Sequence, residues 1–96
     1  MEKRREMRVK RRILSSLEDK PAIIVDMSAS GIQISMNRPP RDQNVDIKLQ
    51  IDGKVITLKG DVRWIARVPT SHSANNIGIA IREAPPEYYR FLSLGH

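Results

Sequence analysis

The sequence predicts an all-β fold, a small six-stranded antiparallel β-barrel with a short C-terminal helix. Apolar and polar residues alternate with a period of two through most of the chain after residue 12, as in strands with one buried face. The pair Asp52-Gly53 separates two such runs, which is a strong hairpin signal. No helical segment lies between the strand runs, so parallel βαβ units are excluded, and about six short antiparallel strands in 96 residues favour a barrel.

The first strand is expected within residues 11–19, where Ile13, Ser15 and Leu17 share a face, and the second at residues 20–27, with a turn near residues 18–19 between them. In the second strand, strict alternation places Ile23, Val25 and Met27 toward the core. Asp26 and Ser28 then face outward together, two residues apart.

The later strands follow the same logic. Residues 31–36 and 44–51 alternate cleanly, and residues 54–68 form one long strand in which Gly60 predicts a bulge or bend. A last strand covers residues 76–81. Pro86 suits the first turn of a helix, so a C-terminal helix is expected from about residue 86.

The composition excludes several classes of function. The chain has no cysteine, and His72 and His96 have no acidic or histidine neighbours at metal-ligand spacing. No catalytic motif is present, so we expect no enzymatic activity, no cofactor and no metal site. Apolar runs are too short for a membrane span, and we expect a cytoplasmic protein.

Positive charge is concentrated at the N-terminus. Residues 1–12 contain seven lysines and arginines but only two glutamates, a net charge of +5, whereas the whole chain carries +6. We therefore divide the chain into a basic ligand-binding arm, residues 1–12, and a barrel domain, residues 13–96. Such an arm attracts phosphates or polyanions, although solvated charge is an equally good explanation of a basic terminus.

The segment 26–31, "DMSASG", carries more polar chemistry than a turn needs. The Asp26 carboxylate matches the adjacent N–H donors of a guanine edge, Ser28 donates or accepts, and Gly31 lets a ligand approach the backbone. The alternative is that Asp26 and Ser28 only shape the turn between two strands.

Both motifs together resemble the PilZ domain family. Arg4 and Arg8 form its RxxxR pattern, and Asp26, Ser28 and Gly31 form its (D/N)xSxxG pattern, in the same order along a β-rich chain. The resemblance implies a six-stranded barrel that binds cyclic di-GMP, in some members as an intercalated dimer. By the family pattern, Arg4 and Arg8 would contact guanine and phosphate, the Asp26 and Ser28 side chains would bond the guanine edge, and Gly31 would fix the turn.

Arg5 is a further candidate ligand-binding residue, and Ser30 and Trp64 are possible additional ones. Arg5 adds an arginine beside the RxxxR pattern, and Ser30 adds a hydroxyl within the turn. Trp64 offers a stacking surface, but its parity with Leu58 predicts a core position unless Gly60 bulges the strand.

Two alternatives to a cyclic di-GMP receptor remain open at this point. The basic arm also suits a small barrel that binds RNA or single-stranded DNA, although only Trp64 among the aromatic residues lies in a predicted strand. The chain is also compatible with an adaptor or a domain of a larger protein. If the chain is a cyclic di-GMP receptor, we expect an unidentified protein partner or host domain to recognise the ligand-bound state.

Overall fold

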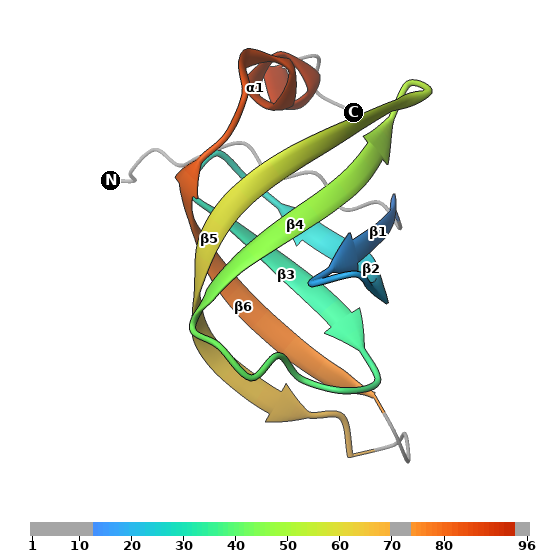
Figure 1. The fold of residues 1–96 in the computed structure, drawn as a ribbon, viewed down its shortest axis with the longest axis vertical. Helices are drawn as coiled ribbons and strands as arrows, with labels where there is room; N and C mark the ends of the chain where they lie inside the picture. The colour runs from blue at the N-terminus through green and yellow to red at the C-terminus, as the bar shows by residue number, and fades with distance from the viewer. Residues whose placement is uncertain (1–12, 70–73, 94–96) are drawn as a thin grey trace, which may run out of the picture.

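In the described part of the chain, six antiparallel strands close into a barrel, and one helix lies beyond one end of it (Figure 1). The computed structural model describes residues 13–69 and 74–93. The elements are β1 (Ile13–Leu17), β2 (Lys20–Met27), β3 (Gly31–Met36), β4 (Asn44–Ile51), β5 (Lys54–Arg67), β6 (Asn75–Glu83) and α1 (Pro86–Ser93). The predicted fold class is confirmed.

Two tight turns join neighbouring strands in sequence. Glu18 and Asp19 both have positive φ, 53° and 66°, between the paired ends of β1 and β2. Asp52 and Gly53 have φ of 52° and 78° between β4 and β5. Positive φ at both central positions is the geometry of a two-residue hairpin turn that matches the twist of the strands. Both predicted turns are therefore confirmed.

The barrel closes through strands that are distant in sequence. The order around the barrel is β1-β2-β3-β6-β5-β4, and β4 returns to pair with β1. The long strand β5 serves two neighbours, because its first half pairs with β4 and its second half with β6. Its register shifts beside Gly60 and again between Val62 and Trp64, so the predicted bulge in this strand is present.

The core fills the barrel with aliphatic side chains from every strand. In β3 and β4 the burial alternates as the sequence predicts, with each isoleucine, leucine, valine and methionine of these strands buried. Of the residues that the structure describes, eighteen hydrophobic ones form this core: Ile13, Leu17, Ala22, Ile24, Met27, Ile32, Ile34, Met36, Val45, Ile47, Leu49, Ile51, Ile56, Leu58, Ile77, Ile79, Tyr88 and Leu92.

The faces predicted for β2 are wrong from Ala22 to the bulge at Val25. Ile24 is fully buried, whereas Ile23 and Val25 are only partly buried. The register against β3 shifts between Ile24 and Asp26, so Val25 is an extra residue in a β-bulge. Beyond the bulge the alternation resumes with Asp26 outward and Met27 inward, as predicted.

Helix α1 packs on the barrel through one face. Tyr88 and Leu92, one turn apart, are its buried residues, and the Tyr88 hydroxyl donates a 2.6 Å hydrogen bond to the carbonyl of Ser28. Pro86 occupies the first helical position, and Glu87 lies in the first turn, where a negative charge is favourable. Among the described residues, no helix has the length and apolar character that crossing a bilayer requires.

Candidate functional site

The β2–β3 turn is held together by its own backbone. The Ser28 N–H donates to the carbonyl of Gly31 at 2.8 Å, and the Ser28 hydroxyl lies 3.3 Å from the same oxygen. The Ser30 carbonyl accepts a 2.9 Å hydrogen bond from the N–H of Ile81, which ties the turn to β6. Ser28 is 1% exposed, so the prediction that it shares the outer face with Asp26 is wrong. It lies beyond the end of β2, where strand alternation no longer applies.

Asp26 occupies the outer face of β2, directly opposite Gln33 of β3. Directly opposed residues of an antiparallel pair point to the same face, and Gln33 alternates with the buried Ile32 and Ile34. The Asp26 side chain is partly buried there, and its Oδ1 atom is shielded from solvent. The bulge at Val25 sets this orientation, because without an extra residue Ile24 and Asp26 would share a face.

A hollow of about 290 Å³ lies beside the turn on the outer face of β3, β5 and β6. We call it the outer-face hollow. It is lined by Ser28, Ser30, Gly31, Ile32, Gln33, Arg63, Trp64, Gly78, Ile79 and Ala80. Small outward residues produce it, because Gly31 lies opposite Ala80, and neither fills the space above the sheet. Three residues of the "DMSASG" segment and Trp64 thus border one cavity.

Trp64 is on the surface, so its predicted core position is wrong. The indole is 47% exposed and lies over Gly78 of β6. The register shift between Val62 and Trp64 breaks the parity from which the core position was inferred. This bulge turns the ring into the outer-face hollow, which leaves Trp64 as a candidate stacking residue.

Sequence reasoning missed Gln33, Arg63 and Gly78 as site residues. The parity of Gln33 with Gly31 already placed it on the outer face, so this residue was within reach of the sequence. Gly78 and Arg63 join the site only through the pairing of β6 with β3 and β5, and no local pattern reveals that pairing.

Arg4, Arg5 and Arg8 lie outside the described residues. The first described residue, Ile13, belongs to β1 and pairs with Ile24 of β2. Ile24, the partner of Ile13, is two residues from Asp26 along β2.

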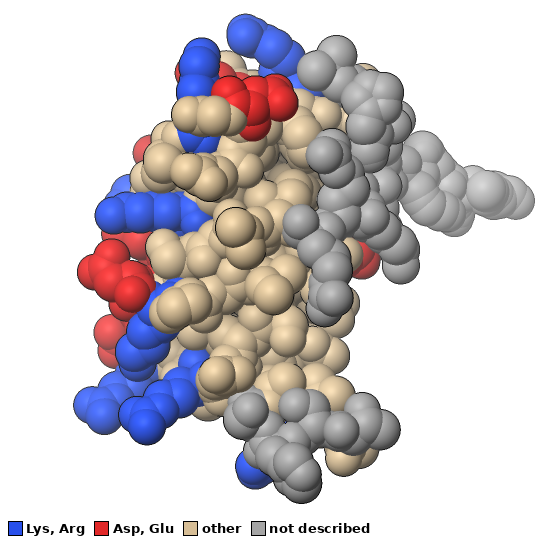
Figure 2. Space-filling view, turned by 90° about the vertical axis from the view of Figure 1, so that its right-hand side faces the viewer, with Lys and Arg blue, Asp and Glu red and all other residues tan. Residues whose placement is uncertain are grey.

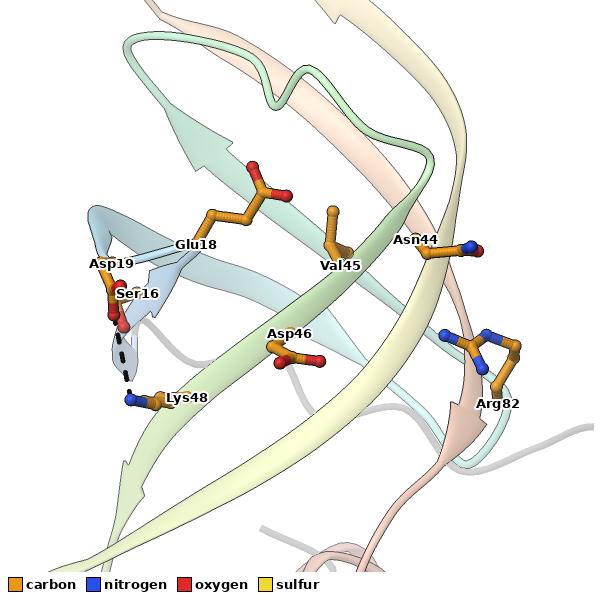
Figure 3. A pocket seen from close by; sticks show the side chains of 8 residues that line it. All are labelled: Ser16, Glu18, Asp19, Asn44, Val45, Asp46, Lys48 and Arg82. Carbon is orange, nitrogen blue, oxygen red and sulfur yellow. Dashed lines mark ion pairs between the residues drawn. The ribbon is translucent and has the colours of Figure 1, made fainter.

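A second hollow, of about 260 Å³, lies away from the motif beside the β1–β2 turn (Figure 3). Its lining includes the acidic residues Glu18, Asp19 and Asp46 and the basic residues Lys48 and Arg82. Lys48 Nζ lies 3.9 Å from a carboxylate oxygen of Asp19. Among the described residues no group of three or more histidine, cysteine, aspartate or glutamate side chains could hold a metal ion. This hollow offers mixed, partly paired charge and no defined site.

Charge on the barrel itself is mixed in sign. On the face shown in Figure 2, basic and acidic side chains lie intermixed along one edge, and uncharged side chains cover the middle. Lys59 pairs with Asp46 at 3.3 Å, and Arg82 pairs with Asp61 at 2.9 Å. The positive excess of the chain therefore resides in residues 1–12.

Comparisons with known proteins agree with this architecture. A family model of the PilZ domain matches residues 2–93. The fold is similar to that of the Bacillus subtilis inhibitor of motility, MotI/DgrA, with a TM-score of 0.74 and 14% identity over 96% of this chain and 48% of that one. This chain thus spans about half the length of that protein. An uncharacterized Legionella protein, Lpg0364, has a TM-score of 0.63 and 22% identity over 91% of this chain and 87% of its own. No curated protein matches the sequence.

Proposed function

The chain belongs to the PilZ domain family, whose members bind cyclic di-GMP, and we propose that it is a receptor module that holds this dinucleotide between its N-terminal arm and the outer-face hollow. PilZ domains are binding modules rather than enzymes. In this proposal, ligand binding draws residues 1–12 against the barrel, and an unidentified protein partner or host domain reads the new surface. We also propose that the module acts in the cytoplasm.

The observation that carries the proposal is the position of the outer-face hollow between the motif turn and Trp64. Asp26 is not part of the lining, but it lies opposite Gln33, which is. A carboxylate accepts two hydrogen bonds side by side, which matches the N1–H and N2–H₂ donors of guanine. The half-exposed indole of Trp64 provides a face on which a base can stack.

The motif residues divide the work in this proposal. Asp26 reads the guanine edge, whereas Gly31 and the buried Ser28 hold the shape of the turn through the hydrogen bond between them. Ser30 is exposed at the rim of the hollow and is available for an additional polar contact with the ligand.

The arm lies within reach of this site. Arg8 is five residues before Ile13, so it lies at most about 17 Å along the chain from the start of β1. Arginine bonds phosphate with two parallel hydrogen bonds and also stacks on purines, which suits Arg4, Arg5 and Arg8 to the ligand phosphates and bases. Three such groups would favour two intercalated ligand molecules over one.

Isothermal titration calorimetry with cyclic di-GMP tests the proposal. We expect the wild-type chain to bind, with two ligands per domain if the dimer forms, and Arg8→Ala and Asp26→Ala to weaken binding by about tenfold or more. Arg41→Ala and Asp46→Ala remove the same kinds of charge from exposed positions outside the site and should bind like wild type.

Two outcomes would contradict the proposal. The first is absence of binding heat at tens of micromolar in a sample that circular dichroism shows to be folded. The second is binding of an RNA or single-stranded DNA oligonucleotide whose affinity rises steeply as the salt concentration falls. In this outcome cyclic di-GMP does not displace the oligonucleotide. That result would favour the nucleic-acid alternative, for which the fold exposes no strand aromatic other than Trp64 among the described residues.

A further inference from the structure

Trp64 and Gly78 interlock on the outer face of the barrel. A Cβ atom at position 78 would overlap the Cε2, Nε1 and Cζ2 atoms of the Trp64 indole. The ring therefore occupies the space that any other residue at position 78 would fill with its own side chain. The two residues are directly paired across β5 and β6, after the second bulge of β5.

This interlock belongs to a row of residues that crosses four strands. Asp26 of β2 lies opposite Gln33 of β3, Gln33 lies opposite Gly78 of β6, and Gly78 lies opposite Trp64 of β5. Adjacent strands are about 4.8 Å apart, so the row extends over about 14 Å. It presents a carboxylate, an amide, bare backbone and an indole in that order.

Glycine in the interior of a strand weakens the strand unless something approaches its backbone closely. Here the indole makes that approach, yet 47% of the Trp64 side chain remains exposed. If the Trp64 ring only covered the glycine of the neighbouring strand, its role would be structural and would affect stability alone. The placement of the same ring in the wall of the outer-face hollow points to a second role.

We propose that Gly78 is a positioning residue, which lets the Trp64 ring lie low against β6 at the height where a purine can stack beside Gln33. This inference rests on the proposed function, because it assigns the stacking surface of the same site. With a side chain at position 78, the ring would swing away from the sheet toward solvent, and the stacking surface would be lost.

The test compares Gly78→Ala, Trp64→Leu and the double variant with wild type. Trp64 is the only tryptophan in the chain, so its emission reports the position of the ring without a label. In Gly78→Ala we expect red-shifted emission, stronger quenching by acrylamide and cyclic di-GMP affinity about tenfold weaker, as in Trp64→Leu. Tyr89→Leu, which removes an aromatic ring that is 43% exposed on α1, should leave the affinity unchanged.

The double variant separates positioning from stability. If Gly78 acts through Trp64, adding Gly78→Ala to Trp64→Leu changes the affinity by no more than about twofold. This background also removes the ring that the new methyl group meets, so the comparison holds even if Gly78→Ala alone folds poorly.

The failures are distinguishable. If wild type binds and the affinity of Gly78→Ala is within about twofold of it, the positioning role is overturned and the proposed function stands. The same holds if Gly78→Ala weakens the affinity further in the Trp64→Leu background. Absence of wild-type binding contradicts the proposed function and the positioning role together.

Discussion

Replacing Tyr88 with phenylalanine removes one buried hydrogen bond and almost nothing else. Tyr88 is fully buried, and its hydroxyl donates to the Ser28 carbonyl at 2.6 Å, sixty positions away in sequence. Phenylalanine keeps the ring and its packing but leaves the carbonyl without this donor. An unsatisfied buried acceptor costs about 1–3 kcal/mol of unfolding free energy.

The expected shift in melting temperature follows from the size of the domain. For a chain of 96 residues, 1 kcal/mol corresponds to about 5 °C, so Tyr88→Phe should melt about 5–15 °C below wild type. Thermal unfolding followed by circular dichroism, with urea titration as a second measure, gives the value.

The neighbouring residue supplies a matched control. Tyr89 undergoes the same chemical change in the same helix, but its side chain is 43% exposed and its hydroxyl can bond water. Tyr89→Phe should therefore melt within about 2 °C of wild type. Equal melting temperatures for the two variants would show that the bond between α1 and the β2–β3 turn contributes nothing to stability.

Three further changes test other parts of the fold. Replacing Glu18-Asp19 with Asn-Gly should raise the free energy of unfolding in urea by about 1–2 kcal/mol. The reason is that Glu18 and Asp19 both adopt positive φ, which asparagine and glycine tolerate at lower cost. An unchanged urea midpoint would contradict this. Gly60→Ala should lower it by more than about 2 kcal/mol, since the added methyl group would lie 2.8 Å from a backbone carbonyl of β6, and a stable variant would show that the barrel yields there. Arg82→Ala should cost less than about 1 kcal/mol despite its 2.9 Å contact with Asp61, because the pair is solvent-accessible; a larger loss that resists high salt would refute this reasoning.

The fold was largely accessible from the sequence where alternation is strict and turns carry their usual residues. Polar and apolar residues alternate without exception in β4, and Asp52-Gly53 marks the turn that follows. In β2 the run Ile23, Ile24, Val25 contains no polar residue to mark which position is the extra one. Parity counted across a bulge necessarily fails, and this single residue accounts for the wrong faces in that strand.

The candidate site was accessible only in part. The turn residues Ser28 and Gly31 are close in sequence, and their motif identified them. Trp64 and Gly78 come together through the register of β5 on β6, which includes two shifts that local propensity does not encode. The geometry of the site is thus a property of strand pairing, which depends on how the whole barrel closes.

Closure of the barrel also limits how other chains can bind to it. Each described strand has a hydrogen-bonded neighbour on both sides over part of its length, so unpaired strand edges are short, as in the first half of β5, which pairs with β4 alone. A partner that adds a strand to the barrel has only these short segments to pair with. Extensive edge-to-edge aggregation requires that the barrel first open. The place for opening is the seam between β1 and β4, where only three residue pairs join the two strands. Resistance to such aggregation should therefore depend on that short seam more than on the stability of the barrel as a whole.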